Sequence, residues 1–96
     1  MADKYELYER GMEYLEGMNG WSDDGSSETV TMPGKAKECF IEAAELGHVF
    51  AQYELARMYE NGIGGEADTE KAIKWYKAAA EKNYQEAIDA LKRLVG

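Results

Sequence analysis

An internal repeat with a spacing of 36 residues is the strongest constraint on how this chain folds. The repeated pairs are Lys35-Ala36 with Lys71-Ala72, Cys39-Phe40 with Trp75-Tyr76, Ala43-Ala44-Glu45 with Ala79-Ala80-Glu81, Ala51 with Ala87, and Leu55 with Leu91. Self-similarity at a fixed period of this length is typical of folds that stack one supersecondary unit on the next. A second echo, at a spacing of 45, relates Gly11-Tyr14-Gly17 to Ala56-Tyr59-Gly62. Nine additional residues are therefore expected between Gly17 and Lys35.

Both copies of the repeat carry small and aromatic residues at the spacing of a helix. They occupy positions i, i+3, i+4, i+7 and i+8: Ala36, Cys39, Phe40, Ala43 and Ala44 in the first copy, and Ala72, Trp75, Tyr76, Ala79 and Ala80 in the second. Such residues form one stripe on a helix, wide enough to face a core. We expect both stripes to be buried against neighbouring helices.

Capping signals predict five helices, and hence an all-α fold. The expected helices cover about residues 4–17 after Asp3, 33–46 from Pro33, 49–61, 69–82 after Asp68 or Thr69, and 85–95. Asp and Thr are good N-caps, and proline suits a first helical turn. Gly17, Gly47, Gly62 and Asn83 are the expected stops, because these residue types adopt the left-handed conformation that ends many helices.

Residues 51–81 resemble one full Sel1-like repeat (SLR), a relative of the tetratricopeptide repeat. The resemblance rests on Leu55, Tyr59, Gly64-Gly65, Asp68, Lys71-Ala72, Trp75-Tyr76 and Ala79-Ala80-Glu81, in that order. It implies a single domain over 1–96, a short α-solenoid of antiparallel helix pairs. In this division 4–47 is a divergent repeat with a loop insertion at about 18–34, 48–82 is a full repeat and 84–96 is a capping helix. The resemblance also implies binding to other proteins and supplies no catalytic residues. Three residues depart from the family pattern: Arg10, Met32 and Cys39 stand where it has leucine, aspartate and tryptophan.

Composition and charge narrow the class of protein further. The net charge is −8, and residues 1–47 hold eleven acidic against four basic residues. Such a chain repels nucleic acids and anionic membranes, so we expect neither as a partner. No apolar run approaches the ~20 residues that a transmembrane helix needs, and the acidic N-terminus is unlike a secretory signal. A cytoplasmic location is therefore expected.

Catalytic and metal-binding patterns are not found in the sequence, so we expect no enzyme, cofactor or metal. The single histidine, His48, and the single cysteine, Cys39, are interpreted as structural residues. The glycines at 62–65 follow a helix and lack the Gly-Lys-Ser/Thr of a phosphate loop. The acidic segment 23–28 lacks the alternating ligands of a calcium loop.

Two features are candidates for partner binding. The first is an acidic ridge on the first helix, beside an aromatic and methionine strip that the core stripe does not require. The second is the insertion, which contains a tryptophan and two aspartates. The candidate residues are Tyr5, Tyr8, Met12, Glu9, Glu13, Glu16, Trp21, Asp23 and Asp24. The alternatives for the strip are that it is a cap or that it packs under the long loop. For the insertion, the hypothesis is that Trp21 or Met32 folds back to fill space left by Cys39, and the alternative is a mobile, glycine- and serine-rich loop with an exposed tryptophan.

The function that the sequence favours is a bacterial-type adaptor or regulator. It would bind a protein with a basic or mixed surface through its concave face and N-terminal end, with aromatic anchors supplying affinity and acidic residues supplying orientation. One alternative is an inhibitor or immunity-type protein that masks a basic partner. Another is a self-associating module that stacks its exposed repeat ends.

Overall fold

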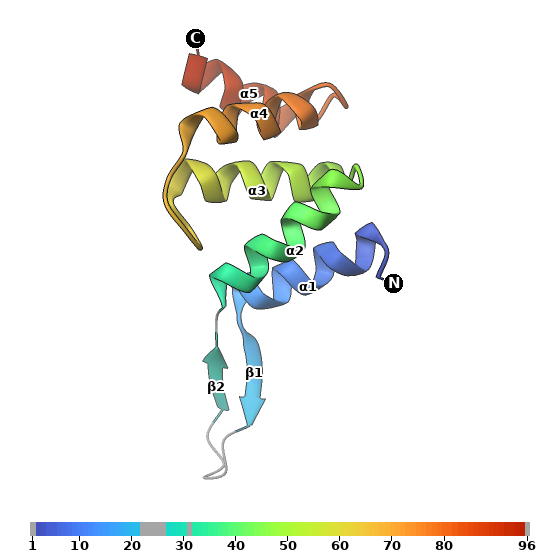
Figure 1. Ribbon diagram of the computed structural model, residues 1–96, viewed down its shortest axis with the longest axis vertical. Helices are drawn as coiled ribbons and strands as arrows, with labels where there is room; N and C mark the ends of the chain where they lie inside the picture. Colours follow the sequence, from blue (N-terminus) through green and yellow to red (C-terminus); the bar gives the residue numbers. More distant parts are fainter. Residues whose placement is uncertain (1, 22–26, 31, 96) are drawn as a thin grey trace.

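The computed structural model describes residues 2–21, 27–30 and 32–95, and for the two short strands it describes the backbone alone. Its helices are α1 (Lys4–Glu16), α2 (Pro33–Glu45), α3 (Val49–Asn61), α4 (Thr69–Ala80) and α5 (Gln85–Val95). Helix α1 packs on α2, α3 packs on both α2 and α4, and α5 packs on α4. In Figure 1 the helices α1, α3 and α5 follow one another along the long axis, with their N-terminal ends on the same side of the molecule. The predicted all-α solenoid is confirmed.

The helix ends follow from the capping residues. Asp3 Oδ1 accepts a hydrogen bond from Glu6 N at 2.9 Å, and Asp68 Oδ1 accepts one from Lys71 N at 3.1 Å. Gly62 ends α3 in the left-handed region at φ 68°, and Asn83 adopts φ 65° between α4 and α5. These side-chain acceptors and left-handed residues satisfy backbone groups that a helix end leaves unpaired.

A β-hairpin forms where the sequence predicted a loop insertion. Strand β1 (Met18–Trp21) pairs antiparallel with β2 (Ser27–Val30), from Met18 opposite Val30 to Trp21 opposite Ser27. Figure 1 shows the hairpin leaving the helices at the end of the molecule opposite α5. Both strands lie outside the two helical stripes, so the solenoid is undisturbed.

The same backbone hydrogen bond closes both helix pairs. Met32 N donates to Tyr14 O at 2.7 Å, and Asp68 N donates to Tyr59 O at 2.7 Å. Tyr14 and Tyr59 are matching residues of the two repeats, as are Met32 and Asp68. The additional residues of the first repeat therefore lie between Tyr14 and Met32, which are joined by the same hydrogen bond as Tyr59 and Asp68 in the second repeat.

The core consists of the predicted stripes together with residues of α1, α3 and α5. Its largest fully buried side chains are Tyr76, Phe40, Leu55 and Met58, surrounded by alanines. Gly11 lies directly against the Phe40 ring, because a Cβ at residue 11 would be only 2.6 Å from Phe40 Cε1. Phe40 and Tyr76 thus anchor the two repeats, as the spacing of 36 predicted.

The fold-back of Trp21 or Met32 toward Cys39 stays a prediction. Trp75, at the position equivalent to Cys39, is half-buried, and so is Cys39 itself. Met32 is the N-cap of α2, and the backbone of Trp21 forms the last pair of the hairpin. The side chain of Trp21 lies outside the described part of the chain.

Candidate functional site

Six aromatic side chains form a continuous strip across the face that α1, α3 and the start of α5 share. This aromatic strip consists of Tyr5, Tyr8, His48, Phe50, Tyr53 and Tyr84. Neighbouring ring centroids lie between 4.5 Å, from Tyr8 to His48, and 6.1 Å, from Tyr8 to Phe50. Aromatic pairs at such distances contribute about 0.5–1.5 kcal/mol beyond the area that they bury. The strip is therefore a preorganised surface.

His48 holds the strip together from within. It precedes α3 as its N-cap, where Nδ1 accepts a hydrogen bond from Ala51 N at 3.2 Å. Its ring is 7% exposed and stacks on Tyr8, with the Tyr5 ring against it edge-on. Burial lowers the pKa of His48, and repulsion by Lys4 and Lys82 lowers it further. The predicted structural role of this histidine is confirmed.

Two members of the strip are strongly exposed. Tyr5 is 62% exposed and Phe50 is 46% exposed. Tyr8, Tyr53 and Tyr84 are half-buried beneath and beside them. Large aromatic side chains that are exposed yet anchored on a rigid base are typical of protein-binding surfaces.

The candidate residues of α1 divide between solvent and core. The ridge residues Glu9, Glu13 and Glu16 are exposed. Tyr8 and Met12 were expected to lie beyond the core stripe, but both pack against the core. These two side chains therefore cover the core, whereas Tyr5 is exposed.

Of the candidates in the insertion, the structure describes only the backbone of Trp21. Trp21 is the last residue of β1, in the hairpin that leaves the helices, and Asp23 and Asp24 lie outside the described residues. In their place the structure adds Phe50, Tyr53 and Tyr84, which the sequence analysis did not single out. The available signal was that His48 and Tyr84 precede equivalent helices, and that Phe50 and Tyr53 follow His48 closely.

A polar cluster beside Tyr53, toward the C-terminal end of α3, has a structural role. Tyr76 Oη donates to Glu60 Oε1 at 2.7 Å, and the Arg93 guanidinium also binds the Glu60 carboxylate. The hydrogen bonds from Arg93 and Tyr76 lower the pKa of Glu60, although partial burial opposes this. The Glu60 carboxylate on α3 thus binds both Tyr76 on α4 and Arg93 on α5, and it links the three helices.

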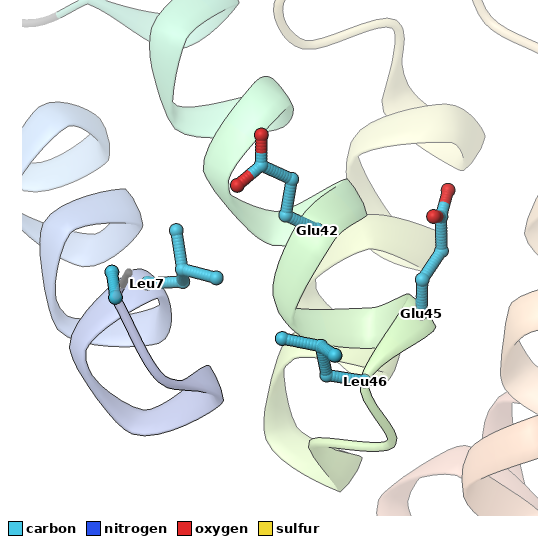
Figure 2. A pocket seen from close by; sticks show the side chains of 5 residues that line it. Leu7, Glu42, Glu45 and Leu46 are labelled. Atoms are coloured by element: carbon cyan, nitrogen blue, oxygen red, sulfur yellow. The ribbon is translucent and has the colours of Figure 1, made fainter.

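A hollow lies between α1 and the end of α2. Figure 2 shows Leu7 and Leu46 on opposite sides of it, with Glu42 and Glu45 along α2. Its volume is about 280 Å³, and Leu46 is 57% exposed. This hollow is apolar at its base and acidic at its rim.

Within residues 2–21, 27–30 and 32–95, no group of three or more His, Cys, Asp or Glu side chains is placed to hold a metal ion. Burial raises the pKa of the Cys39 thiol, which keeps it protonated and weakly nucleophilic. In the same part of the chain no helix is long and apolar enough to cross a membrane.

Comparison with known proteins assigns the family. The family model described as "Sel1 repeat" matches residues 33–48 and 49–88. The chain belongs to the Sel1-like repeat family. Repeats of this family generally mediate protein–protein interactions, and proteins built from them are typically not enzymes. The resemblance found in the sequence is confirmed.

Solved structures of SLR proteins share the fold. A Sel1 repeat protein from Oxalobacter formigenes has 33% sequence identity and a TM-score of 0.81, over 95% of this chain and 24% of that chain. A protective antigen of uropathogenic Escherichia coli strains, described as displaying an SLR fold, has 32% identity and a TM-score of 0.75, over 93% of this chain and 17% of that one.

A curated relative is the chitin synthase regulatory factor 3 of Schizosaccharomyces pombe. It is 40% identical over 55 residues, which are 57% of this chain and 6% of the relative. The chain thus spans only a small part of the SLR proteins that it matches.

Proposed function

We propose that this SLR chain is an adaptor or regulator that binds a partner protein through its aromatic strip and N-terminal end. The observation that carries the proposal is the strip itself, in which exposed Tyr5 and Phe50 are held by His48 and the half-buried tyrosines. Aromatic side chains that lose little rotamer freedom on binding are efficient anchors. The strip spans the face formed by α1, α3 and the start of α5.

Charge supports a partner with a mixed surface. The exposed carboxylates of Glu9, Glu13 and Glu16 on α1 attract a basic region and orient it, while Lys4 and Lys82 flank the strip beside Tyr5 and Phe50. Charged groups at the rim of an interface act mainly on the association rate and on register. The name of the fission-yeast relative, a regulatory factor, supports a regulatory role.

The proposal is tested by affinity capture with matched variants. Wild-type protein and the Tyr5→Ala, Phe50→Ala and Val95→Ala variants are immobilised and exposed to a lysate of the source organism. A specific partner is retained by wild type and by Val95→Ala, an exposed apolar residue away from the strip, and is lost with Tyr5→Ala and Phe50→Ala. Circular dichroism confirms that each variant is folded. Equal retention by all four proteins contradicts the role of the strip.

Self-association is a second candidate function, favoured by the hollow of Figure 2. Leu46 and Leu7 line an apolar surface with the acidic residues Glu42 and Glu45, and α5 carries exposed Val95 near the basic residue Lys92. These two surfaces are complementary in charge and in apolar character. Light scattering across a concentration series tests this candidate. Weak interfaces dissociate at about micromolar concentrations, so a mass that stays that of the monomer at tens of micromolar rejects self-association.

A further inference from the structure

A basic pocket interrupts the surface of this acidic protein at one end of the aromatic strip. It lies where the start of α1, the α2–α3 turn and the α4–α5 turn meet, and its volume is about 250 Å³. Its lining consists of Lys4, Tyr5, Gly47, His48, Val49, Phe50 and Lys82. None of these residues carries a carboxylate, although the chain as a whole has a net charge of −8.

Two lysines line the same pocket as the His48 ring. The positive charges of Lys4 and Lys82 both lower the pKa of His48, in addition to the larger effect of its burial. Lys82 Nζ donates a hydrogen bond to the Gly47 carbonyl oxygen, which fixes its head group over the α2–α3 turn. Neither lysine forms an ion pair with a described carboxylate. Ammonium groups carry three donors each, so both retain donors for a ligand.

The walls beside the lysines are apolar and exposed. Tyr5 and Phe50 are the two most exposed rings of the strip, and they flank the buried His48 ring at centroid distances of 5.4 and 5.8 Å. The pocket therefore offers cations and aromatic surface within one small volume. A ligand that fits it combines a negative group with an adjacent apolar group.

We propose that this pocket takes an acidic–apolar segment of the partner protein, with a side-chain carboxylate between Lys4 and Lys82 and the neighbouring apolar side chain on Tyr5 and Phe50. This inference rests on the proposed function and specifies the chemistry of the partner at one point of the strip. Charge complementarity carries it, because two unpaired ammonium groups beside exposed rings are satisfied by a carboxylate and an apolar side chain together.

The experiment uses a synthetic peptide, acetyl-Gly-Glu-Leu-Glu-Phe-Gly-amide, whose blocked ends leave side-chain carboxylates as its only charges. It is titrated into the ¹⁵N-labelled full chain at low salt and followed by NMR. The expected result is saturable shifts at Lys4, Tyr5, His48, Phe50 and Lys82. The peptide with Gln in place of both Glu residues should bind at least about tenfold more weakly, which corresponds to 1.4 kcal/mol.

Matched lysine variants assign the effect to the pocket. Lys82→Met and Lys4→Met should each weaken binding several-fold and reduce its dependence on salt. Lys77→Met, on the exposed part of α4, should leave the affinity unchanged. The inference is overturned if no shifts saturate, if the Gln peptide binds equally well, or if Lys82→Met and Lys77→Met behave alike.

The outcome is distinguishable from failure of the proposed function. If Phe50→Ala abolishes capture of a partner while Lys4→Met and Lys82→Met do not, the strip is a binding surface and the acidic–apolar ligand is wrong. If the Glu peptide binds through both lysines, the chemistry of the pocket is supported independently of any captured protein.

Discussion

Replacing Gly11 by alanine should destabilise the protein, although alanine is the better helix former. Gly11 lies inside α1, where a change from glycine to alanine alone stabilises a helix by about 1 kcal/mol. A Cβ there would approach three atoms of the Phe40 ring at 2.6, 2.8 and 2.9 Å. Phe40 is 0% exposed, so its ring can move only if the core side chains around it shift as well. Overpacking of this kind costs about 1–3 kcal/mol, so the expected net loss is about 1 kcal/mol.

A second helical glycine provides the control. Gly34 lies in the first turn of α2, and a Cβ there meets nothing within 4 Å. Gly34→Ala should therefore leave the free energy of unfolding unchanged or raise it. In urea titrations followed by circular dichroism, the two variants should differ by about 1–3 kcal/mol. In a thermal melt, a 1 kcal/mol loss corresponds to a Tm lower by about 4–8 °C for a domain of this size.

The cause is isolated by a double-mutant cycle. Phe40→Leu removes part of the ring that the new methyl group would strike, so Gly11→Ala should cost less in the Phe40→Leu background. A coupling energy of at least about 0.5 kcal/mol is expected for residues in contact. The reasoning is refuted if Gly11→Ala is as stable as Gly34→Ala, or if the cycle shows no coupling.

Three further predictions concern caps, pH and the polar cluster. Met32 caps α2 without a side-chain hydrogen bond, whereas the equivalent Asp68 caps α4 with one. In urea titrations, Asp68→Ala should lower the free energy of unfolding by about 1 kcal/mol, and Met32→Asp should raise it by up to a similar amount. Because the pKa of His48 is lowered in the folded state, the unfolded chain binds the proton more readily, so the free energy of unfolding should fall as pH drops below about 6.5 and level off below the folded pKa. His48→Asn replaces the capping Nδ1 by an amide oxygen that also accepts a hydrogen bond, and it should lack this decline between pH 7 and 5.5. An identical decline in both proteins would contradict the assignment. Glu60→Leu should cost about 1–3 kcal/mol, because the buried Tyr76 hydroxyl loses its acceptor. Glu60→Gln retains an acceptor and should cost less, and equal losses in the two variants would exclude this explanation.

The helices could be predicted because their signals are local and repeated. Asp3, Gly62 and Asn83 act on backbone groups within a few residues, and each occupies the expected cap or stop. The burial of Phe40 and Tyr76 followed from the same spacing, because helices that carry equal stripes pack in equal ways. The residues that determine these helix ends and stripes all lie within a single repeat.

The hairpin and the strip could not be predicted for a common reason. In β1 and β2, four residues each are too few to give a clear alternation, and their register depends on pairing across the turn. The strip joins Tyr5 and Tyr8 to His48 and Phe50, about 40 residues later in the chain. Spacing placed Tyr5 and Tyr8 on one face of their helix, but only the packing of α1 on α2, which brings the α2–α3 turn beside them, determines which rings they meet.

The bond between Tyr14 O and Met32 N makes the first repeat tolerant of added chain. It encloses 17 residues, where its counterpart between Tyr59 and Asp68 encloses 8, yet both are 2.7 Å long. Roughly doubling a flexible loop costs only about 0.6 kcal/mol in closure entropy. New segments can thus be acquired or lost at this point in evolution, or grafted there by design, while the stacking of the helices stays the same.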